Sequence, residues 1–216
     1  TYKTSASSPY VFGGYGPKEW TQRTSGTTST LANNSQPNCG VYDGTNYILT
    51  GASGVLLAST NAIQWSARTS GSGTTTLSSI AYFSGATYPY LLGGNSGVLN
   101  ASSDGIIWQL RTAGTGSYIG GFSYKSTPSE EYLATGGAGL ISVSTNTIVW
   151  VLRTAGSTVN LANPIFYNSQ YYAPVGTAII TSTNNIIWTS RTTPAPQTNY
   201  SIYSDGSNLI SHSASG

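Results

Sequence analysis

Charge is scarce in this sequence. Only 6% of its 216 residues are Asp, Glu, Lys or Arg, whereas about a quarter is usual in a soluble protein. The formal net charge is +2, and no run of Lys or Arg occurs. A nucleic-acid-binding protein needs several clustered phosphate contacts. We therefore expect no nucleic-acid partner.

Cysteine, histidine and long apolar runs are also rare. One cysteine, Cys39, excludes a disulfide framework within the chain and a cysteine-rich zinc site. One histidine, His212, gives no support to a catalytic triad or a His-based metal site. No apolar stretch approaches the roughly 18 residues that cross a bilayer, and no signal-peptide pattern is visible. We expect no metal, no cofactor and no membrane insertion.

The surface helix formers Glu, Lys, Gln and Met are nearly missing. Ser, Thr, Gly, Asn, Tyr, Ile and Val dominate instead, and these residues favour strands and turns. The chain is 38% hydrophobic and 12% aromatic, which is enough to bury a core. The composition therefore predicts an all-β protein with a polar but weakly charged surface.

A repeat organises the chain. Each of the five tryptophans opens the phrase Trp-x-x-Arg-Thr, at Trp20, Trp65, Trp108, Trp150 and Trp188. Four of them follow a Ser-(Ser/Thr)-(Asn/Asp) step that ends four residues earlier, at Asn61, Asp104, Asn146 and Asn184. We expect these Asn and Asp side chains to cap a turn by accepting backbone N–H groups. Two apolar runs come before that step, and each unit opens with a short strand that carries Tyr42, Tyr82, Tyr124, Tyr167 or Tyr203. Each unit thus reads as four strands.

The spacing of the repeat predicts a closed ring. Successive tryptophans are 45, 43, 42 and 38 residues apart, and the path from Trp188 through both termini to Trp20 covers 48 residues. Residues 208–216 look like a second strand and its turn, and residues 1–5 look like a third strand. We predict one domain, residues 1–216, that forms a five-bladed β-propeller of four-stranded blades with its last blade closed by both termini. Residues 6–19 form an insertion in that blade, and we expect a partner contact there.

The repeat resembles the Asp-box type of propeller repeat, approximately Ser-x-Asp-x-Gly-x-x-Trp. Ser102-Ser-Asp104-Gly-Ile-Ile-Trp108 is the most similar copy, one residue shorter, and three other copies carry Asn in place of Asp. The fifth unit departs from the pattern through its insertion. The phrase Trp-x-x-Arg-Thr with a Gly turn and a Tyr strand looks like propellers of bacteriophage tail-fibre and virion-surface proteins. It is also similar to repeats of photosystem assembly-factor propellers. The resemblance implies fold more than function.

Sialidases are enzymes that share the Asp-box. By resemblance they need an arginine cluster, a Tyr/Glu nucleophile pair and an acid/base Asp. The six carboxylates here are Glu19, Asp43, Asp104, Glu130, Glu131 and Asp205. Asp104 belongs to a turn and Glu130-Glu131 to a polar loop, so no pair facing one sugar at about 5–10 Å is indicated. We expect no catalytic residues and no enzyme activity. We also expect each tryptophan to pack between blades with its indole N–H bonded, and Cys39 to be buried.

The repeated arginines have two interpretations. They are Arg23, Arg68, Arg111, Arg153 and Arg191, and no acidic residue repeats in register with them. One interpretation is structural, with guanidinium groups bonded to turn carbonyls or stacked on a tyrosine of the next blade. The other is a fivefold set of sites for anionic groups such as carboxylated or sulfated sugars. The structural interpretation is favoured because strict repetition usually marks the scaffold.

The loops after each Trp-x-x-Arg-Thr phrase are the other candidate sites. Sugar sites combine aromatic faces with amide and hydroxyl hydrogen bonds. The candidates of these types are Asn33, Asn34, Tyr118, Asn160, Asn163, Gln197 and Tyr200. The alternative is that these loops are solvated turns.

The sequence thus predicts a non-enzymatic, extracellular binding module, for example on a phage virion, that recognises glycans or a host or virion surface protein. The alternative is a structural or decorating subunit of a virion or other extracellular assembly, which binds only a neighbouring protein. A weakly charged Ser/Thr/Asn/Tyr surface suits both.

Overall fold

The computed structural model describes residues 25–31, 38–192 and 199–213. Regular structure in these ranges consists of strands and three single-turn 3-10 helices, η1 (Ala52–Gly54), η2 (Asn95–Gly97) and η3 (Gly137–Gly139). The prediction of an all-β chain is confirmed.

Four antiparallel four-stranded sheets follow one another along the chain. We call them the first to fourth blades. The first blade consists of β1 (Gly40–Tyr42), β2 (Tyr47–Thr50), β3 (Leu56–Ser59) and β4 (Ser66–Ala67). The second consists of β5 (Leu77–Tyr82), β6 (Tyr90–Gly94), β7 (Val98–Ser102) and β8 (Gln109–Thr112). The third consists of β9 (Ile119–Lys125), β10 (Glu131–Gly136), β11 (Leu140–Ser144) and β12 (Val151–Thr154). The fourth consists of β13 (Ile165–Tyr167), β14 (Gln170–Val175), β15 (Ala178–Ser182) and β16 (Thr189–Thr192).

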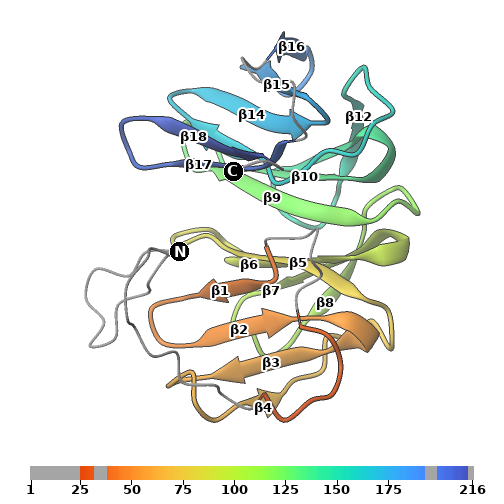
Figure 1. The fold of residues 1–216 in the computed structure, drawn as a ribbon, viewed down its shortest axis with the longest axis vertical. Coiled ribbons are helices and arrows are strands. Elements are labelled where there is room, and N and C mark those ends of the chain that lie inside the picture. The colour runs from red at the N-terminus through yellow and green to blue at the C-terminus, as the bar shows by residue number, and fades with distance from the viewer. Residues whose placement is uncertain (1–24, 32–37, 193–198, 214–216) are drawn as a thin grey trace.

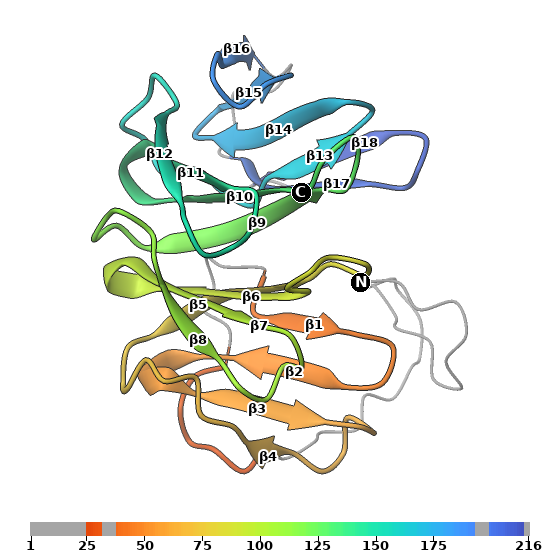
Figure 2. The same cartoon turned by 180° about the vertical axis from the view of Figure 1, so that it is seen from behind.

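A fifth sheet contains β17 (Asn199–Ser204) and β18 (Leu209–Ser213), the predicted first two strands of the fifth blade. The blades lie face to face in chain order, with β17 and β18 beside the third and fourth blades (Figures 1 and 2). The first strands are neighbours: β5 contacts β1 and β9, β9 contacts β13, and β13 contacts β17. They therefore line the axis, and each fourth strand lies at the outer edge. The remaining predicted strands of the fifth blade, and the insertion at residues 6–19, lie outside the described residues.

The turn between the third and fourth strands forms as predicted. In four blades the Asn or Asp Oδ1 accepts hydrogen bonds at 2.8 to 3.0 Å from the backbone N–H groups two and three residues on; the acceptors are Asn61, Asp104, Asn146 and Asn184. The serine two residues earlier donates its hydroxyl to the same oxygen. The repeated Asn/Asp step is therefore a side-chain cap for a tight turn.

The turn between the second and third strands requires glycine. Gly97 has a φ of +74°, and a Cβ built on it would lie 2.0 Å from the carbonyl oxygen of Thr115. Gly54 and Gly139 stand at the same position, with their Cβ sites 1.9 and 1.8 Å from the carbonyls of Gly73 and Ser157. In these three blades the loop that leaves the fourth strand therefore packs directly on this turn of its own blade.

Three tryptophans pack between blades, as predicted, whereas Trp20 lies outside the described residues. Trp108 packs with residues of the first and second blades, Trp150 with the second and third, and Trp188 with the third and fourth. Of these three, Trp150 alone meets the expectation of a bonded indole, since its Nε1 donates to the carbonyl of Thr147 at 3.0 Å. The Nε1 atoms of Trp108 and Trp188 are buried without a hydrogen bond. Cys39 is buried, as expected.

The first and second strands of each four-stranded blade are joined by an aromatic pair. The ring centroids are 4.5 Å apart for Tyr42–Tyr47, 4.9 Å for Tyr82–Tyr90 and 5.0 Å for Tyr124–Tyr132. In the fourth blade the pair is Phe166–Tyr171, at 4.7 Å, because Phe166 is the residue opposite Tyr171 in the sheet. The residue that matches Tyr124 is therefore Phe166 and not Tyr167, although both lie on the predicted strand.

Candidate functional site

A cavity of about 400 Å³ lies among the first strands. Residues from β9, β13 and β17, the segment before β13, and Phe83 after β5 form its wall. The lining residues are Phe83, Phe122, Ser123, Tyr124, Asn163, Pro164, Ile165, Phe166, Ile202, Tyr203 and Ser204. No charged side chain is among these described lining residues. We call this the axial cavity.

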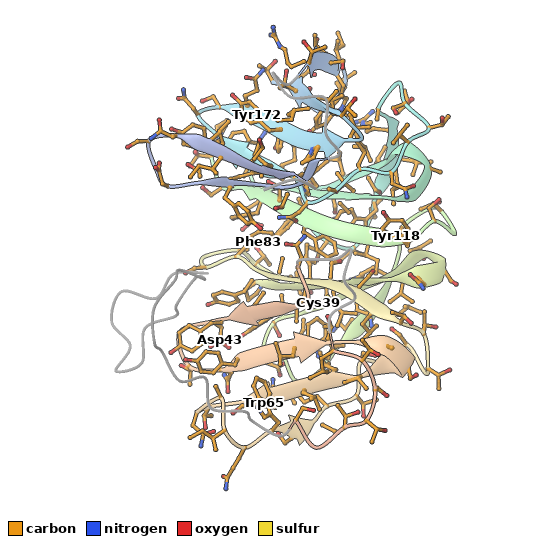
Figure 3. The ribbon with its side chains drawn as sticks, viewed as in Figure 1. Cys39, Asp43, Trp65, Phe83, Tyr118 and Tyr172 are labelled. Carbon is orange, nitrogen blue, oxygen red and sulfur yellow. The ribbon has the colours of Figure 1, made fainter. Side chains whose placement is uncertain are left out.

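Aromatic rings dominate the axial cavity. Phe83 stacks on Tyr124 with centroids 5.4 Å apart and ring planes 28° apart. Figure 3 shows Phe83 between the second blade and β9. Tyr203 is 47% exposed, and Phe166 is held by its contact with Tyr171. Rings from four consecutive blades therefore converge on one space, because every first strand runs along the axis.

Neutral hydrogen-bonding groups complete the wall. The Asn163 Oδ1 accepts the Phe122 N–H at 3.2 Å, which fixes the amide against β9. The Tyr124 hydroxyl donates to Glu130 Oε1 at 3.0 Å. Burial and this carboxylate raise the pKa of Tyr124, so its hydroxyl stays protonated at neutral pH. The hydroxyls of Ser123 and Ser204 add further polarity to the wall. The arrangement offers ring faces and neutral polar groups to a ligand.

Glu130 fixes the outer side of this wall. It accepts hydrogen bonds from the Thr87 N–H at 3.1 Å and hydroxyl at 2.9 Å in the second blade. The Tyr132 hydroxyl also donates to it, at 3.2 Å. Burial alone would raise the pKa of Glu130, but these hydrogen bonds outweigh it and lower the pKa. Glu130 therefore links the second and third blades as a carboxylate.

Carboxylates also link the first blade to the second and the third blade to the fourth. The Tyr90 hydroxyl of the second blade donates to Asp43 Oδ2 of the first at 2.6 Å. Burial raises the pKa of Asp43, but hydrogen bonds, chiefly from the Asn46 N–H and Tyr90, outweigh it and lower the pKa. Between the third and fourth blades, Glu131 accepts from the Tyr171 hydroxyl and from Asn185 Nδ2. Each of these carboxylates is thus occupied by a neighbouring blade.

Asn163 is the predicted ligand-binding residue that the structure places in the axial cavity. Asn160 is exposed, and its Oδ1 accepts the Ala138 N–H at 3.0 Å, across the loop and turn of one blade. Tyr118 is half-buried against Gly136 and Gly137, at the end of β9 opposite Phe83 (Figure 3). Burial raises the Tyr118 pKa. These residues do not gather into one site.

The described arginines are distributed singly along the outer edge. Arg68 Nη1 donates to the carbonyl of Gly105 in the next blade at 2.7 Å, which matches the structural interpretation. Arg111 lies 5.4 Å from the centroid of the Tyr88 ring in its own blade and donates to Gln109 Oε1 at 2.6 Å. Arg153 and Arg191 are exposed. Their one-per-blade spacing does not form a cluster of guanidinium groups at the axis.

The structure does not describe the side chains of the other predicted ligand-binding residues. Arg23, Asn33, Asn34 and Gln197 lie outside the described residues, and for Tyr200 only the backbone, within β17, is described. Four residues of the axial cavity were not predicted as site residues: Phe83, Tyr124, Phe166 and Tyr203. Their common signal was visible, since each lies on or next to a first strand that carries a repeated tyrosine.

Within residues 25–31, 38–192 and 199–213, no cluster of three or more His, Cys, Asp or Glu side chains with metal-binding geometry occurs. In the same ranges no helix has the length and apolarity to cross a bilayer.

No protein-family model and no curated protein sequence matches this chain. Solved β-propellers do match its structure. An ancestral GH74 enzyme aligns with a TM-score of 0.61 and 17% identity over 85% of this chain and 27% of the enzyme. YCF48 bound to D1 peptide aligns with a TM-score of 0.61 and 17% identity, over 83% of this chain and 61% of YCF48.

The WD40 β-propeller domain of Doa1 aligns with a TM-score of 0.59 and 14% identity, over 86% of this chain and 65% of that one. The chain thus spans about a quarter of the GH74 enzyme and about three fifths of YCF48. At these identities the likeness establishes the fold alone. The chain has the β-propeller fold, built from repeated four-stranded antiparallel sheets similar to those of GH74 and YCF48 propellers.

Proposed function

We propose that this chain is a non-catalytic recognition module that binds a neutral glycan in the axial cavity. The observation that carries the proposal is the aromatic wall, which lacks a charged side chain among its described residues. Sugar rings present apolar C–H faces that pack on aromatic rings, and their hydroxyls bond to amide and hydroxyl groups. Phe83, Tyr124, Phe166 and Tyr203 supply the rings, and Asn163 supplies the amide.

The surroundings of the carboxylates favour binding over catalysis. Glu130 and Glu131 already accept hydrogen bonds from tyrosines of their own or the next blade. Burial and the neighbouring carboxylate raise the pKa of Tyr171, which disfavours the tyrosinate that a nucleophile needs. The proposal therefore assigns no catalytic residue.

The Asp-box-like turns and the weakly charged surface support an exposed setting for this module, on a virion or another extracellular surface. In that setting many copies are displayed together. Weak binding at each cavity then becomes strong binding to a multivalent glycan surface.

The first test is a glycan array with neutral and anionic sugars at low and high salt, followed by titration of the best neutral glycan. We expect neutral binding that persists in high salt, because no ion pair contributes. Tyr203→Ala should weaken binding at least about tenfold, or about 1.4 kcal/mol. Tyr172→Ala is the matched control, since Tyr172 does not line the axial cavity and its hydroxyl bonds locally to Gln170.

Two results would contradict the proposal. Binding restricted to anionic sugars, abolished by salt and by Arg153→Ala, would assign recognition to the repeated arginines instead. Absence of binding by the folded protein to every glycan would favour the second function, a structural or decorating subunit. Exposed aliphatic side chains along the outer strands favour that second function.

A further inference from the structure

The outer edge of the second and third blades exposes large aliphatic side chains. Ile107 is 69% exposed and Leu110 is 68% exposed, and the same holds at matching positions of the next blade. The full set, which we call the rim patch, is Ile106, Ile107, Leu110, Ile148, Val149, Val151 and Leu152. A cluster of this kind is unusual on a free surface and is typical of an interaction site.

Contacts between blades make the rim patch continuous. Between the first and second blades, and between the second and third, the end of a fourth strand lies against the segment that follows the capped turn of the next blade. Arg68 donates to the carbonyl of Gly105, directly before Ile106. Thr112, directly after Arg111, forms a parallel bridge with Val149. An arginine of one blade therefore lies beside the aliphatic pair of the next.

These arginines lack acidic partners among the described residues. The ion pair found there is Lys125–Glu131, with 3.3 Å between the nitrogen and the oxygen, and it lies in the third blade's first turn. Arg111 contacts neutral groups, and Arg153 is exposed. The rim patch thus combines apolar surface with arginines that form no ion pair among the described residues, and its one nearby carboxylate, Asp104, is bonded to the backbone of its own turn.

The outermost strands also present a backbone edge. β8 pairs with β7 and β12 pairs with β11, each on one side. Apart from the Thr112–Val149 bridge, no described strand pairs with the other side. In an antiparallel pair, alternate N–H and C=O groups point away from the partner strand. A further strand can therefore add to either edge.

We propose that the rim patch binds an extended segment of a partner protein, aliphatic on one face and acidic on the other, as an added strand on β8 or β12. The partner's aliphatic side chains cover Leu110 or Leu152, and its carboxylates pair with Arg111 or Arg153. This proposal is independent of the glycan site, because it uses the outer strands and not the axis.

The chemistry of the rim patch disfavours two other occupants. A second copy of the chain would bring arginines against arginines, which repel. A bilayer would leave the exposed backbone edges of β8 and β12 without hydrogen-bond partners in hydrocarbon, which is strongly unfavourable. An acidic polypeptide strand can pair its carboxylates with the arginines and can form hydrogen bonds with the free backbone edge of β8 or β12.

The fourth blade supplies matched variants. There β16 carries Thr189, Ser190 and Arg191 where β12 carries Val151, Leu152 and Arg153. The triple variant V151T/L152S/L110S therefore places on β12 and β8 the residue types that the fold already accepts on β16. The reverse variant, T189V/S190L, builds an additional apolar edge on the fourth blade.

The probe is a fluorescent peptide of alternating Val and Glu, with alternating Val–Lys and Thr–Glu peptides as controls, measured by anisotropy. We expect binding of the Val–Glu peptide alone, weakened at least about tenfold by V151T/L152S/L110S and by high salt. T189V/S190L should raise the number of peptides bound per chain. Circular dichroism and melting curves of each variant confirm that the fold is intact.

Four outcomes would overturn the proposal. They are equal binding of the Val–Lys peptide, failure of the Val–Glu peptide to bind, and binding that the triple variant leaves unchanged. The fourth is a different occupant. The protein would then bind phosphatidylglycerol vesicles, or self-associate in sedimentation, without binding the peptide, and the triple variant would abolish that association.

Discussion

The axis and the rim of this propeller are built from the same repeat but present opposite chemistry. First strands at the axis bring aromatic rings together, and the nearby carboxylates are occupied by hydrogen bonds between blades. Fourth strands at the rim expose aliphatic side chains and leave arginines without carboxylate partners among the described residues. The difference teaches that the repeat keeps the backbone the same, whereas the position of a strand within its blade decides which side chains are covered.

The largest expected difference between interior and rim is in stability. Leu133 is fully buried between the third and fourth blades, and Leu152 is 52% exposed on β12. Leu133→Ala should lower the free energy of unfolding by about 2–5 kcal/mol, because it leaves a cavity. Leu152→Ala should change it by less than about 0.5 kcal/mol. Chemical denaturation measures both; equal losses would show that the rim patch is covered in the folded protein.

The rim also contains a structural element, the capped turn. Asp104→Ala removes the acceptor for two backbone N–H groups and should cost about 1 kcal/mol, by analogy with helix caps. Asp104→Asn should be nearly neutral, because Asn61, Asn146 and Asn184 make the same bonds. Thermal unfolding of the two variants compares them. A neutral Ala variant would mean that the turn forms without its side-chain cap.

The smallest effect concerns the carboxylate links near the axis. Hydrogen bonds lower the pKa of Glu130 below its ordinary value of 4.5 in the folded protein. Its stabilisation is therefore present above that pH and is lost as the pH falls through the folded-state pKa. The melting temperature should decline in acid, and Glu130→Gln should lower it near neutral pH and flatten the decline.

Asp43 and Asp104, whose pKa values are also lowered, should keep part of that acid dependence in the Glu130→Gln variant. Thr87→Val is the matched control, since it removes a single hydroxyl donor to Glu130 and leaves the carboxylate in place. An unchanged pH profile in Glu130→Gln would show that Glu130 does not link the second and third blades in solution.

Much of the fold was predictable because its signals are local. A tryptophan phrase, an Asn/Asp cap and a glycine turn each determine a few residues of backbone, and their spacing determined the four-stranded unit. The capped turns at Asn61, Asp104, Asn146 and Asn184 formed as predicted. Indole bonding was predicted less well, because the partner of Nε1 depends on the turn before each tryptophan. Trp150 bonds to its turn, but Trp108 and Trp188 do not.

The candidate site was less predictable. Asn163 was identified for its type, but the rings beside it were not, because their convergence depends on how neighbouring first strands approach the axis. In the fourth blade the strand pairing places Phe166, and not Tyr167, opposite Tyr171. The sequence could not show which of these two adjacent aromatic residues lies opposite Tyr171, because a one-residue shift in strand pairing exchanges the two faces of a strand.

By itself, the sequence determined the all-β class, the repeat unit and the position of each turn, since these follow from local propensity and periodicity. The tertiary structure decided which side chains are exposed and which residues form hydrogen bonds with one another. The pair Ile106-Ile107 before Trp108 has the composition of a core segment, yet both isoleucines are exposed. Glu130 stands in a polar loop of the sequence, yet it bonds to Thr87, 43 residues earlier. Only the packing of one blade on another brings such groups together or leaves them uncovered.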